Sequence, residues 1–463
     1  MKQLFFDDSK LLCIENLQRK YVAPQLEEVY WDEECSTDWC TVYVFQMKDG
    51  TYEMFYVGKD VFSHKMNCVW ATSEDGIHFQ KKQTQEIHDV LGLPDVETEI
   101  GCIYEDPYAD EDSRYKMLVC CTNKERVIQE NLLYLSSDLR NWRQKQGVCW
   151  GEGAEPIVDV FYNQQRECYT ICLRPAWGVR SIGYVETKNW EDFTEFSPCM
   201  QVDSIDEHLS ELYGMKVFEY DGLYIGFPFL YYGLKNEYNA KFLGGNIGCQ
   251  LAYSEEGRYW KRSLRDFFLE GTTASDILGY ETPLTWLSCA RKTKEGDVMM
   301  YASTSQYVHG EAFGNPGTGR IHVYRVKKDR FIKLETQDKE KESKVCTREM
   351  IWHGGELHIN LEASNATVSV RETKEFENDW NLLAFSTPLE GFSHEDCESF
   401  CGDCTNWVPK FKSGKSFNEL IGKTIMVEIR LSDGCLYSIE GNYTSVGNIP
   451  ACQYRRSLGS KSM

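Results

Sequence analysis

The segment "AYSEEGRYWKR" (residues 252–262) recurs in the chain with small variations. The other copies are "ATSEDGIHFQK" (71–81), "LSSDLRNWRQK" (135–145) and the weaker "VETKNWEDFTE" (185–195). Each copy has a Ser or Thr, then an acidic or polar turn, then an aromatic residue followed by polar or charged positions. A phrase repeated in this way indicates a repeated structural unit.

The spacing of the copies gives the size of that unit. The aromatic residues that end the copies lie 63, 51 and 67 residues apart and are Phe79, Trp142, Phe193 and Trp260. A degenerate fifth copy, "VYRVKKDRFIKLE" (323–335), places Phe331 another 71 residues along the chain. Intervals of this length leave room for several strands in each unit.

A hairpin pattern precedes each copy. In "TVYVFQMKDGTYEMFYVG" (41–58), alternating apolar residues flank Asp49-Gly50, which is a strong hairpin signal. Comparable segments occupy residues 101–119, 158–173, 214–230 and 286–303. Each unit therefore contains two hairpin strands, a third strand that carries the repeated segment, and a fourth.

Four antiparallel strands repeated radially form the blade of a β-propeller. Regular short strands also occur in β-sandwiches, but the unit length and the recurring third-strand segment favour the propeller. The sequence thus predicts an all-β chain with a five-bladed β-propeller built from residues 30–335. We expect the residues before Trp31 to supply the outer strand that closes the ring onto the last blade.

The pattern changes after Phe331. A charged link, "KLETQDKEKESK" (333–344), is followed by the segment 354–372, whose pattern predicts two alternating strands, and by "IMVEIRLSDGCLYSIEG" (425–441), whose pattern predicts a hairpin. These predict a small C-terminal β-sandwich. The expected domains are a catalytic propeller at 1–335, the sandwich at 336–450 and a flexible tail at 451–463.

Composition limits the classes of partner. The net charge of −22 argues against nucleic acid and against an anionic membrane surface. No stretch approaches the roughly 18 apolar residues of a membrane span, and the N-terminus lacks the features of a signal peptide. The 19 scattered cysteines suggest reduced, buried side chains in a cytoplasmic protein. The sequence leaves the oligomeric state open.

An acidic residue stands near the start of the innermost strand of each unit. These residues are Asp38, Glu97 or Glu99, Glu155, Glu211 and Glu281. One acid at a strand start is ordinary. Because the innermost strands of a propeller begin at its central channel, acids at the same position in all five units are expected to converge at one mouth of that channel.

Clustered carboxylates repel one another, so some of their pKa values rise while others stay low. One carboxyl can then act as an acid and another as a base or nucleophile, as cleavage of a glycosidic bond requires. Converging carboxylates are also ligands for Ca²⁺. We therefore expect no cofactor for catalysis, with a structural calcium ion as the alternative use of the acids.

Other residue types surround the predicted mouth. Aromatic rings can stack on sugars, and arginines can bind hydroxyl groups or hold an acid in its charged form. The candidates for substrate binding, beside Glu99 and Glu281, are Trp39, Arg174, Arg180, His208, Tyr213, Trp286 and His309. Asp106, in "YEDPY" (104–108), is set aside because it falls in a turn at the far end of its strand.

Beyond these patterns, the chain resembles the five-bladed propeller glycosidases of glycoside hydrolase families 32 and 43. More closely, it is similar to uncharacterised bacterial proteins described as like the family 32 N-terminal domain. The segments that carry the resemblance are "GAEPIVDVFYNQQRECYTICLR" (153–174), "ELYGMKVFEYDGLYIGF" (211–227), "CQLAYSEEGRYWKRS" (249–263), "GGELHINLEASNATVSVRE" (354–372) and "LEGFSHEDCESFCGDC" (389–404).

The resemblance implies three catalytic acids. Asp38 matches the first-blade nucleophile or base, Glu155 the third-blade acid that tunes the site, and Glu211 the fourth-blade proton donor. Around Asp38 only the Asp of the family's Asn-Asp-Pro-Asn-Gly run is present, and Glu155 replaces the usual Asp. The family loop near Cys397, Cys401 and Cys404 does not require all its cysteines, so we expect no zinc there even though His394 could be a fourth ligand.

Three functions follow as hypotheses. The leading one is a hydrolase that cleaves a small oligosaccharide or glycoside, with a furanoside as the first guess by analogy. A second is a glycoside phosphorylase like those of family 130, which needs one acid and a basic cluster to hold phosphate. The third is a carbohydrate-binding propeller without turnover. In each case the expected partner is a small carbohydrate.

Overall fold

In the computed structural model, the described residues are 1–38, 41–93, 97–122, 129–151, 154–155, 157–175, 180–232, 245–270, 282–311, 315, 317–372 and 387–446. The chain is nearly all β, with curled sheets. Within the described ranges the helical elements are α1 (Ile87–Leu91) and two short 3₁₀ turns, Glu111–Ser113 and Phe417–Leu420. Two compact units form, one from Ala23–Val326 and one from Met1–Val22 with Lys327–Met463.

The larger unit begins with three antiparallel sheets in chain order. The first holds β5 (Cys35–Ser36), β6 (Val42–Gln46), β7 (Tyr52–Asp60), β8 (Met66–Ser73) and β9 (Gln80–Glu86). The second holds β10 (Glu97–Glu105), β11 (Tyr115–Thr122), β12 (Gln129–Ser136) and β13 (Arg143–Cys149). The third holds β14 (Asp159–Asn163), β15 (Cys168–Leu173), β16 (Ile182–Thr187) and β17 (Ser197–Met200).

The remaining strands of this unit form an eight-stranded sheet with two halves. One half holds β18 (Glu211–Tyr220), β19 (Leu223–Tyr232), β20 (Asn246–Cys249) and β21 (Ala252–Ser254). The other holds β22 (Leu284–Lys292), β23 (Val298–Ser305), β24 (Arg320–Val326) and β4 (Gln25–Tyr30). A single bridge between Ile247 and Leu284 joins the halves.

The five predicted hairpins all form, as β6–β7, β10–β11, β14–β15, β18–β19 and β22–β23. The third strands also match the prediction, since β8, β12, β16 and β21 each end on the Ser or Thr of a repeated segment. The expected closing strand is present too, because β4 pairs with β24. The hairpin and repeat pattern of the sequence is therefore confirmed.

The repeated segment is a tight hydrogen-bonded turn. In the first copy, the Ser73 hydroxyl accepts the backbone N–H groups of Asp75 and Gly76, at 3.2 and 3.0 Å. In these four copies, the residue three positions after the Ser or Thr is left-handed, with φ of 76° at Gly76, 62° at Leu139, 60° at Trp190 and 78° at Gly257. The hydroxyl and acidic positions recur because they satisfy the N–H groups that this turn exposes.

Each turn packs against the sheet that comes before it. Trp70 of β8 donates to the Leu139 carbonyl at 2.9 Å, and Asn163 of β14 donates to the Glu256 carbonyl at 2.8 Å. Tyr301, on β23 of the last sheet, donates to the Gly76 carbonyl at 2.8 Å. The first turn thus packs on the last sheet, which links the end of this unit to its beginning.

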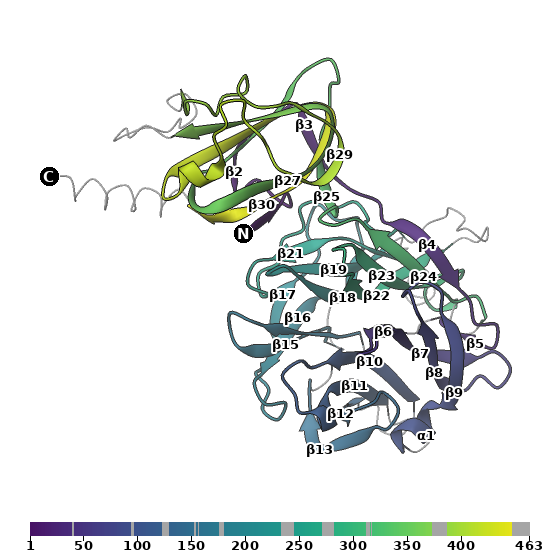
Figure 1. Ribbon diagram of the computed structural model, residues 1–463. Coiled ribbons are helices and arrows are strands. Elements are labelled where there is room, and N and C mark those ends of the chain that lie inside the picture. Colours follow the sequence, from purple (N-terminus) through teal and green to yellow (C-terminus); the bar gives the residue numbers. More distant parts are fainter. Residues whose placement is uncertain are drawn as a thin grey trace. The chain divides into compact units, whose positions relative to one another are not determined.

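The first strand of each group lies beside the next one, in the order β6, β10, β14, β18, β22 and back to β6. Figure 1 labels β6, β10, β18 and β22 in the middle part of this unit. Between β6 and β10 the link is made by side chains, since Tyr43 donates to the Gly101 carbonyl at 2.7 Å and Thr41 to the Ile100 carbonyl at 2.9 Å. The five first strands therefore surround one central space.

A buried lysine crosses that space. The ammonium of Lys216, on β18, donates to the carbonyls of Val158 and Gly101 at 2.6 and 3.1 Å, and lies 3.4 Å from the Tyr43 hydroxyl. Gly101 lies in β10 and Tyr43 in β6, and Val158 is the residue just before β14. Because every proton of the ammonium has an acceptor, Lys216 braces the middle of the unit.

The predicted domain boundaries need correction. The first three strands, β1 (Lys2–Leu4), β2 (Leu11–Glu15) and β3 (Leu17–Tyr21), pair with β30, β26 and β25 rather than with the propeller-like unit. Residues 1–22 therefore belong to the C-terminal unit, which starts at Lys327 rather than at 336. The degenerate copy with Phe331 does not supply a fourth strand to the last group, because β4 is the strand that pairs with β24. Phe331 belongs to the C-terminal unit.

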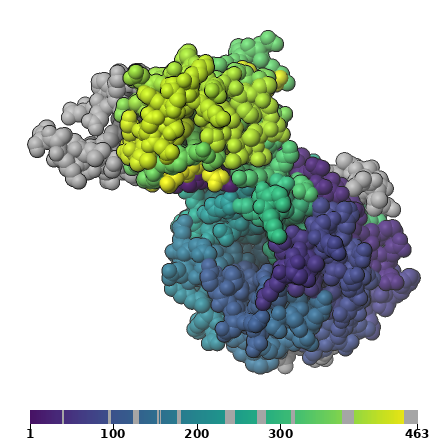
Figure 2. Space-filling view, in the orientation of Figure 1, coloured from purple at the N-terminus to yellow at the C-terminus, as the bar shows by residue number. Residues whose placement is uncertain are grey.

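The smaller unit forms one nine-stranded sheet. Besides β1 to β3, it holds β25 (Ile332–Thr336), β26 (Ser343–Thr347), β27 (Met350–Glu372), β28 (Thr387–Pro388), β29 (Phe400–Trp407) and β30 (Thr424–Ser445). The two strands predicted at 354–372 are one long strand, β27, and the hairpin predicted at 425–441 is part of the long strand β30, where Asp433 has a φ of 39°. In Figure 2 yellow C-terminal and purple N-terminal residues share this unit. The predicted tail, 451–463, lies outside the described residues.

Candidate active site

Three predicted acids lie at the starts of neighbouring first strands. Glu99 is in β10, Glu211 is the first residue of β18, and Glu155 comes just before β14. Glu155 is fixed by its backbone, whose N–H donates to the Arg174 carbonyl at 2.9 Å. The strand phase that predicted these positions therefore brings acids from three groups of strands to one end of the central space.

Arg174 pairs with Glu155. Its guanidinium nitrogen Nη2 lies 3.3 Å from Oε2 of Glu155, and the arginine is 5% exposed. Burial lowers the pKa of Arg174, while the neighbouring Tyr213 and Glu155 raise it. The arginine thus supplies a poorly hydrated positive charge beside a carboxylate that is still partly open to water.

Arg180 pairs with Glu211. Its Nη1 donates to Oε2 of Glu211 at 2.5 Å, and its carbonyl accepts the Leu212 N–H at 3.3 Å. The Glu211 residue is 5% exposed. A charge-assisted bond of this kind stabilises the ionised form of the carboxyl group.

Tyr213 lies between the two arginines. The guanidinium carbons of Arg174 and Arg180 are 4.7 and 5.5 Å from the centre of its ring. Its hydroxyl is 3.0 Å from Nε2 of His309, which brings the segment after β23 to the same site. Burial raises the pKa of Tyr213, so the ring stays neutral and connects the two ion pairs.

Glu99 has a different environment from its neighbours. As a residue it is exposed to solvent, beside the buried Thr98 and Ile100. Its pKa is raised to about 7, chiefly by the loss of solvation, then by the negative charges of Glu97 and Glu155, with Arg174 acting in the opposite direction. Glu99 is therefore a carboxyl group that can keep its proton near neutral pH.

Asp38 makes a different set of contacts. Its carboxylate accepts hydrogen bonds from the hydroxyls of Ser36 and Thr318, at 2.6 and 3.0 Å, and from the backbone N–H groups of Gly317 and Thr318, both at 3.2 Å. A Cβ on Gly319 would collide with the backbone of Thr37 and Asp38. We call this set of contacts the clasp, because it joins the first sheet to the segment before β24.

The other predicted site residues have mixed outcomes. His208 is exposed in the segment before β18, and Trp286 is a buried residue of β22. Trp39 and Glu281 lie outside the described residues. Asp106 has a structural role, since it accepts hydrogen bonds from Lys116 at 2.5 Å and from Tyr169 at 2.9 Å.

Tyr231 was missed from the sequence. It is fully buried, its ring centre is 4.7 Å from that of His309, and Arg180 lies 5.5 Å from its ring. Tyr231 pairs with Glu211 across the β18–β19 hairpin. Counting the pairs outward from the Asp221-Gly222 turn in the sequence would have placed the partner of Glu211 one residue from Tyr231. A bulge after Leu212 causes the difference of one residue.

The described residues contain no group of three or more His, Cys, Asp or Glu side chains arranged to hold a metal ion. His394 instead contacts Glu428 at 3.0 Å and Thr367 at 2.9 Å, and Cys397 is buried with its sulfur 3.3 Å from the Val368 N–H. The 17 cysteines in the described ranges are free thiols. No helix in those ranges has the length and apolar character needed to cross a membrane.

Comparisons with known proteins give distant structural likenesses. No family model and no curated protein matches the chain. Solved structures that resemble it include a glycoside hydrolase (TM-score 0.44, 11% identity, covering 67% of this chain and 92% of the other). An N-acetylgalactosamine deacetylase from F. plautii, in complex with blood group B trisaccharide, has a TM-score of 0.42 at 11% identity and covers 67% and 95%. A mannose phosphorylase from Leishmania mexicana, in complex with a phosphate ion, has 0.41 at 10% and covers 65% and 88%.

Proposed function

We propose that the chain is a carbohydrate-active enzyme that hydrolyses a glycosidic bond at the starts of its first strands. The proposed scaffold is a five-bladed β-propeller followed by a small β-sandwich formed by the curled nine-stranded sheet. The cyclic order of the first strands supports the propeller, together with the packing of the Gly76 turn on Tyr301 of the last sheet.

One observation carries the proposal, namely that two carboxyl groups of the site have opposite environments. Glu99 has a pKa of about 7, whereas Arg180 stabilises the carboxylate of Glu211. Acid and base roles in one site depend on such a difference between two carboxyl groups. A glycosidase needs one carboxylic acid to protonate the leaving oxygen and one carboxylate to act on the other side of the bond.

These environments suggest roles that differ from those the resemblance implies. We assign proton donation to Glu99 and the carboxylate role to Glu211, with Glu155 and Arg174 setting the charge between them. Glu211 is a poor proton donor while Arg180 holds it ionised. Asp38, with four hydrogen bonds in the clasp, is assigned to the scaffold.

The alternative is phosphorolysis, and one observation favours it. Two guanidinium groups, of Arg174 and Arg180, lie against the same ring, and His309 lies against its hydroxyl. Guanidinium groups bind phosphate through paired hydrogen bonds. In this reading a phosphate ion takes the place of the attacking water, while Glu99 keeps its role as acid.

A glycoside panel tests the proposal. Aryl and alkyl glycosides of common pyranoses and furanoses are incubated with the protein in phosphate-free buffer and in added inorganic phosphate. Release of free sugar without phosphate, lost in Glu211→Gln, supports hydrolysis. Formation of sugar phosphate only when phosphate is added supports phosphorolysis. Binding without turnover of any glycoside in either buffer rejects both and leaves a carbohydrate-binding protein.

A further inference from the structure

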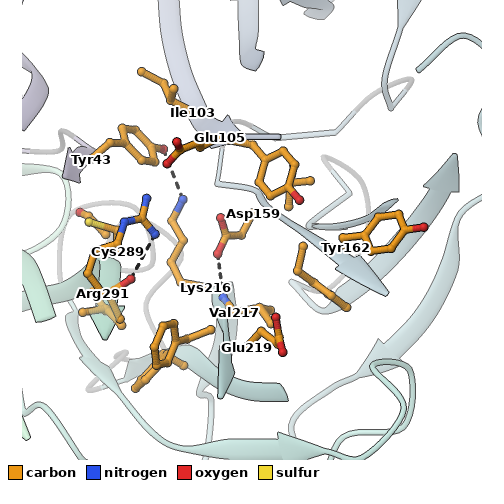
Figure 3. Close-up of a pocket in the computed structure, with 18 of the residues that line it drawn as sticks. Tyr43, Ile103, Glu105, Asp159, Tyr162, Lys216, Val217, Glu219, Cys289 and Arg291 are labelled. Carbon is orange, nitrogen blue, oxygen red and sulfur yellow. Dashed lines mark hydrogen bonds between the residues drawn. The ribbon is translucent and has the colours of Figure 1, made fainter. Parts of the chain in front are cut away.

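A second cavity lies further along the same first strands. It has a volume of about 330 Å³, and residues of all five strands line it, among them Tyr43, Glu105, Asp159, Lys216 and Arg291 (Figure 3). The Glu99 site lies at the starts of the strands, whereas Lys216 stands five residues after Glu211 and Glu105 six after Glu99. The cavity and the Glu99 site are thus separate places along one set of strands.

Lys216 marks the boundary between these two places. It is 2% exposed, and its ammonium is held by the carbonyls of Gly101 and Val158. Figure 3 shows Lys216 and Asp159 in the middle of the cavity, with Arg291 and Cys289 on one side and Tyr162 on the other. Because its protons are bound to protein acceptors, Lys216 closes the inner end of the cavity rather than offering a free charge to a ligand.

The remaining lining mixes hydrogen-bond acceptors, a donor and aromatic rings. The acceptors are the carboxyl groups of Glu219, of Asp159, which also accepts the Val217 N–H at 2.7 Å, and of Glu105, which also accepts from Arg114 at 3.0 Å. The donor is the guanidinium of Arg291, whose Nε donates to the Val44 carbonyl at 2.7 Å and whose Nη1 donates to the Ala290 carbonyl at 3.2 Å. Aromatic surface comes from Tyr108, Tyr162 and Phe218.

The chemistry of this lining indicates which class of ligand the cavity can bind. The lining carries charges of both signs, with carboxyl groups beside the guanidinium of Arg291, so no single charge dominates it. A sugar hydroxyl both donates and accepts, so it can use the carboxylates and the guanidinium together, while the apolar face of a sugar packs against aromatic rings. The volume lies near the lower end of the roughly 300–1,000 Å³ of ligand pockets, which suits a single sugar ring.

We propose that this cavity is a second carbohydrate site, which binds one neutral monosaccharide or similar polyol without cleaving it. It does not depend on the hydrolytic role proposed for Glu99. The two sites share strands β10, β14 and β18 but no side chain that both use to contact a sugar.

Isothermal titration calorimetry tests the proposal. The full chain carrying Glu211→Gln, which removes turnover, is titrated with D-glucose, D-galactose, D-mannose, L-arabinose and myo-inositol, and with glucuronate and glucosamine as charged probes. We expect saturable binding of at least one neutral probe. Tyr162→Ala and Glu219→Gln should each weaken it at least tenfold, whereas Tyr259→Ala, at a ring that is 81% exposed elsewhere, should not change it.

Three outcomes would overturn the proposal: no saturable binding of any neutral probe, tighter binding of glucuronate or glucosamine than of every neutral probe, or neutral binding that Tyr162→Ala and Glu219→Gln leave intact. A crystal soaked in the tightest neutral probe guards against misfolded variants, because the sugar must then appear beside Asp159 and Arg291. Density only beside Glu99 would count against the second site.

Discussion

The two ends of the first strands use charge in opposite ways. At the strand starts, Arg174 and Arg180 face the carboxylates of Glu155 and Glu211, and Glu99 is left with a raised pKa. Further along, the charge of Lys216 is bound by backbone carbonyls. The comparison teaches that the partner of a buried charge decides its role. Ion pairs between side chains leave Glu99 with a pKa near neutral, whereas backbone carbonyls around Lys216 form a structural brace.

The largest expected effect is at the strand starts, in Glu99→Gln. If Glu99 donates the proton, kcat for alkyl glycosides should fall about 10²–10⁴-fold, as for loss of a general acid. Dinitrophenyl glycosides, whose leaving group needs no proton, should lose far less. Kinetics on both substrate types, with the exposed Glu130→Gln of β12 as the control, measure the difference, and equal losses on both would contradict the role.

The pH dependence of activity in the wild type and in Glu99→Gln tests the raised pKa of Glu99. Glu99 is protonated below its pKa of about 7, so wild-type activity should decline above that pH, and the decline should be absent from the residual activity of Glu99→Gln. A carboxyl with a raised pKa favours folding at low pH, and its contribution is lost as the pH rises from 4.5 to about 7. Glu99→Gln should therefore unfold at a higher temperature than the wild type above pH 7.

The brace should behave differently. Lys216→Met leaves the carbonyls of Gly101 and Val158 without their donor and Asp159 without a nearby positive charge, so we expect a loss of about 3 kcal/mol in the free energy of unfolding. Urea unfolding measures it. Lys292→Met, at a half-exposed ion pair with Asp221, is the control and should cost under about 1 kcal/mol. Equal losses in the two variants would remove the distinction between brace and surface.

The next variant tests whether Asp38 is a catalytic residue or a structural one. Asp38→Asn keeps the size of the side chain but weakens its bonds to Gly317 and Thr318, so we expect a loss of about 1–2 kcal/mol in unfolding free energy and activity within about tenfold of the wild type. Gly319→Ala should destabilise the same clasp by about 1–3 kcal/mol through overpacking. A loss of activity above about a thousandfold in Asp38→Asn, with stability unchanged, would instead restore it as a nucleophile or base.

The smallest effect is expected far from both ends. Ser136→Ala removes the hydroxyl that accepts the N–H groups of Asp138 and Leu139 at 3.2 and 3.1 Å. By analogy with a helix cap, this costs about 1 kcal/mol and leaves activity unchanged. Thermal unfolding beside the exposed neighbour Ser137→Ala checks it, and a change in kcat would show that the turns affect the site.

The sequence predicted the repeat well because the information is local. Each hairpin and each Ser-acid turn is specified within about twenty residues, and an acid at the same phase in every unit located Glu99, Glu155 and Glu211. The ion pairs could not be predicted in the same way, since Arg180 reaches Glu211 from 31 residues away. The second cavity was also hidden, because its lining residues alternate along ordinary strands and meet only once the strands surround a common space.

The domain boundary failed for a related reason. The pairing of β3 with β25 joins residues more than 300 positions apart, for example Leu17 with Thr336, and nothing in the short segments 2–21 marks their distant partner. Asp38 shows the same limit. Its position at a strand start was correct, but the four donors that surround it come mostly from residues 317 and 318, which no local pattern connects with it.

The pairing of β4 with β24 has a consequence for synthesis on the ribosome. Strand β4 is synthesised almost 300 residues before its partner β24. Until β24 is synthesised, the edge of β4 is exposed to other chains and the last sheet is incomplete. Chaperone demand should therefore peak in nascent chains that stop short of residue 320, and a circular permutant that moves residues 23–30 behind Val326 should fold with less assistance.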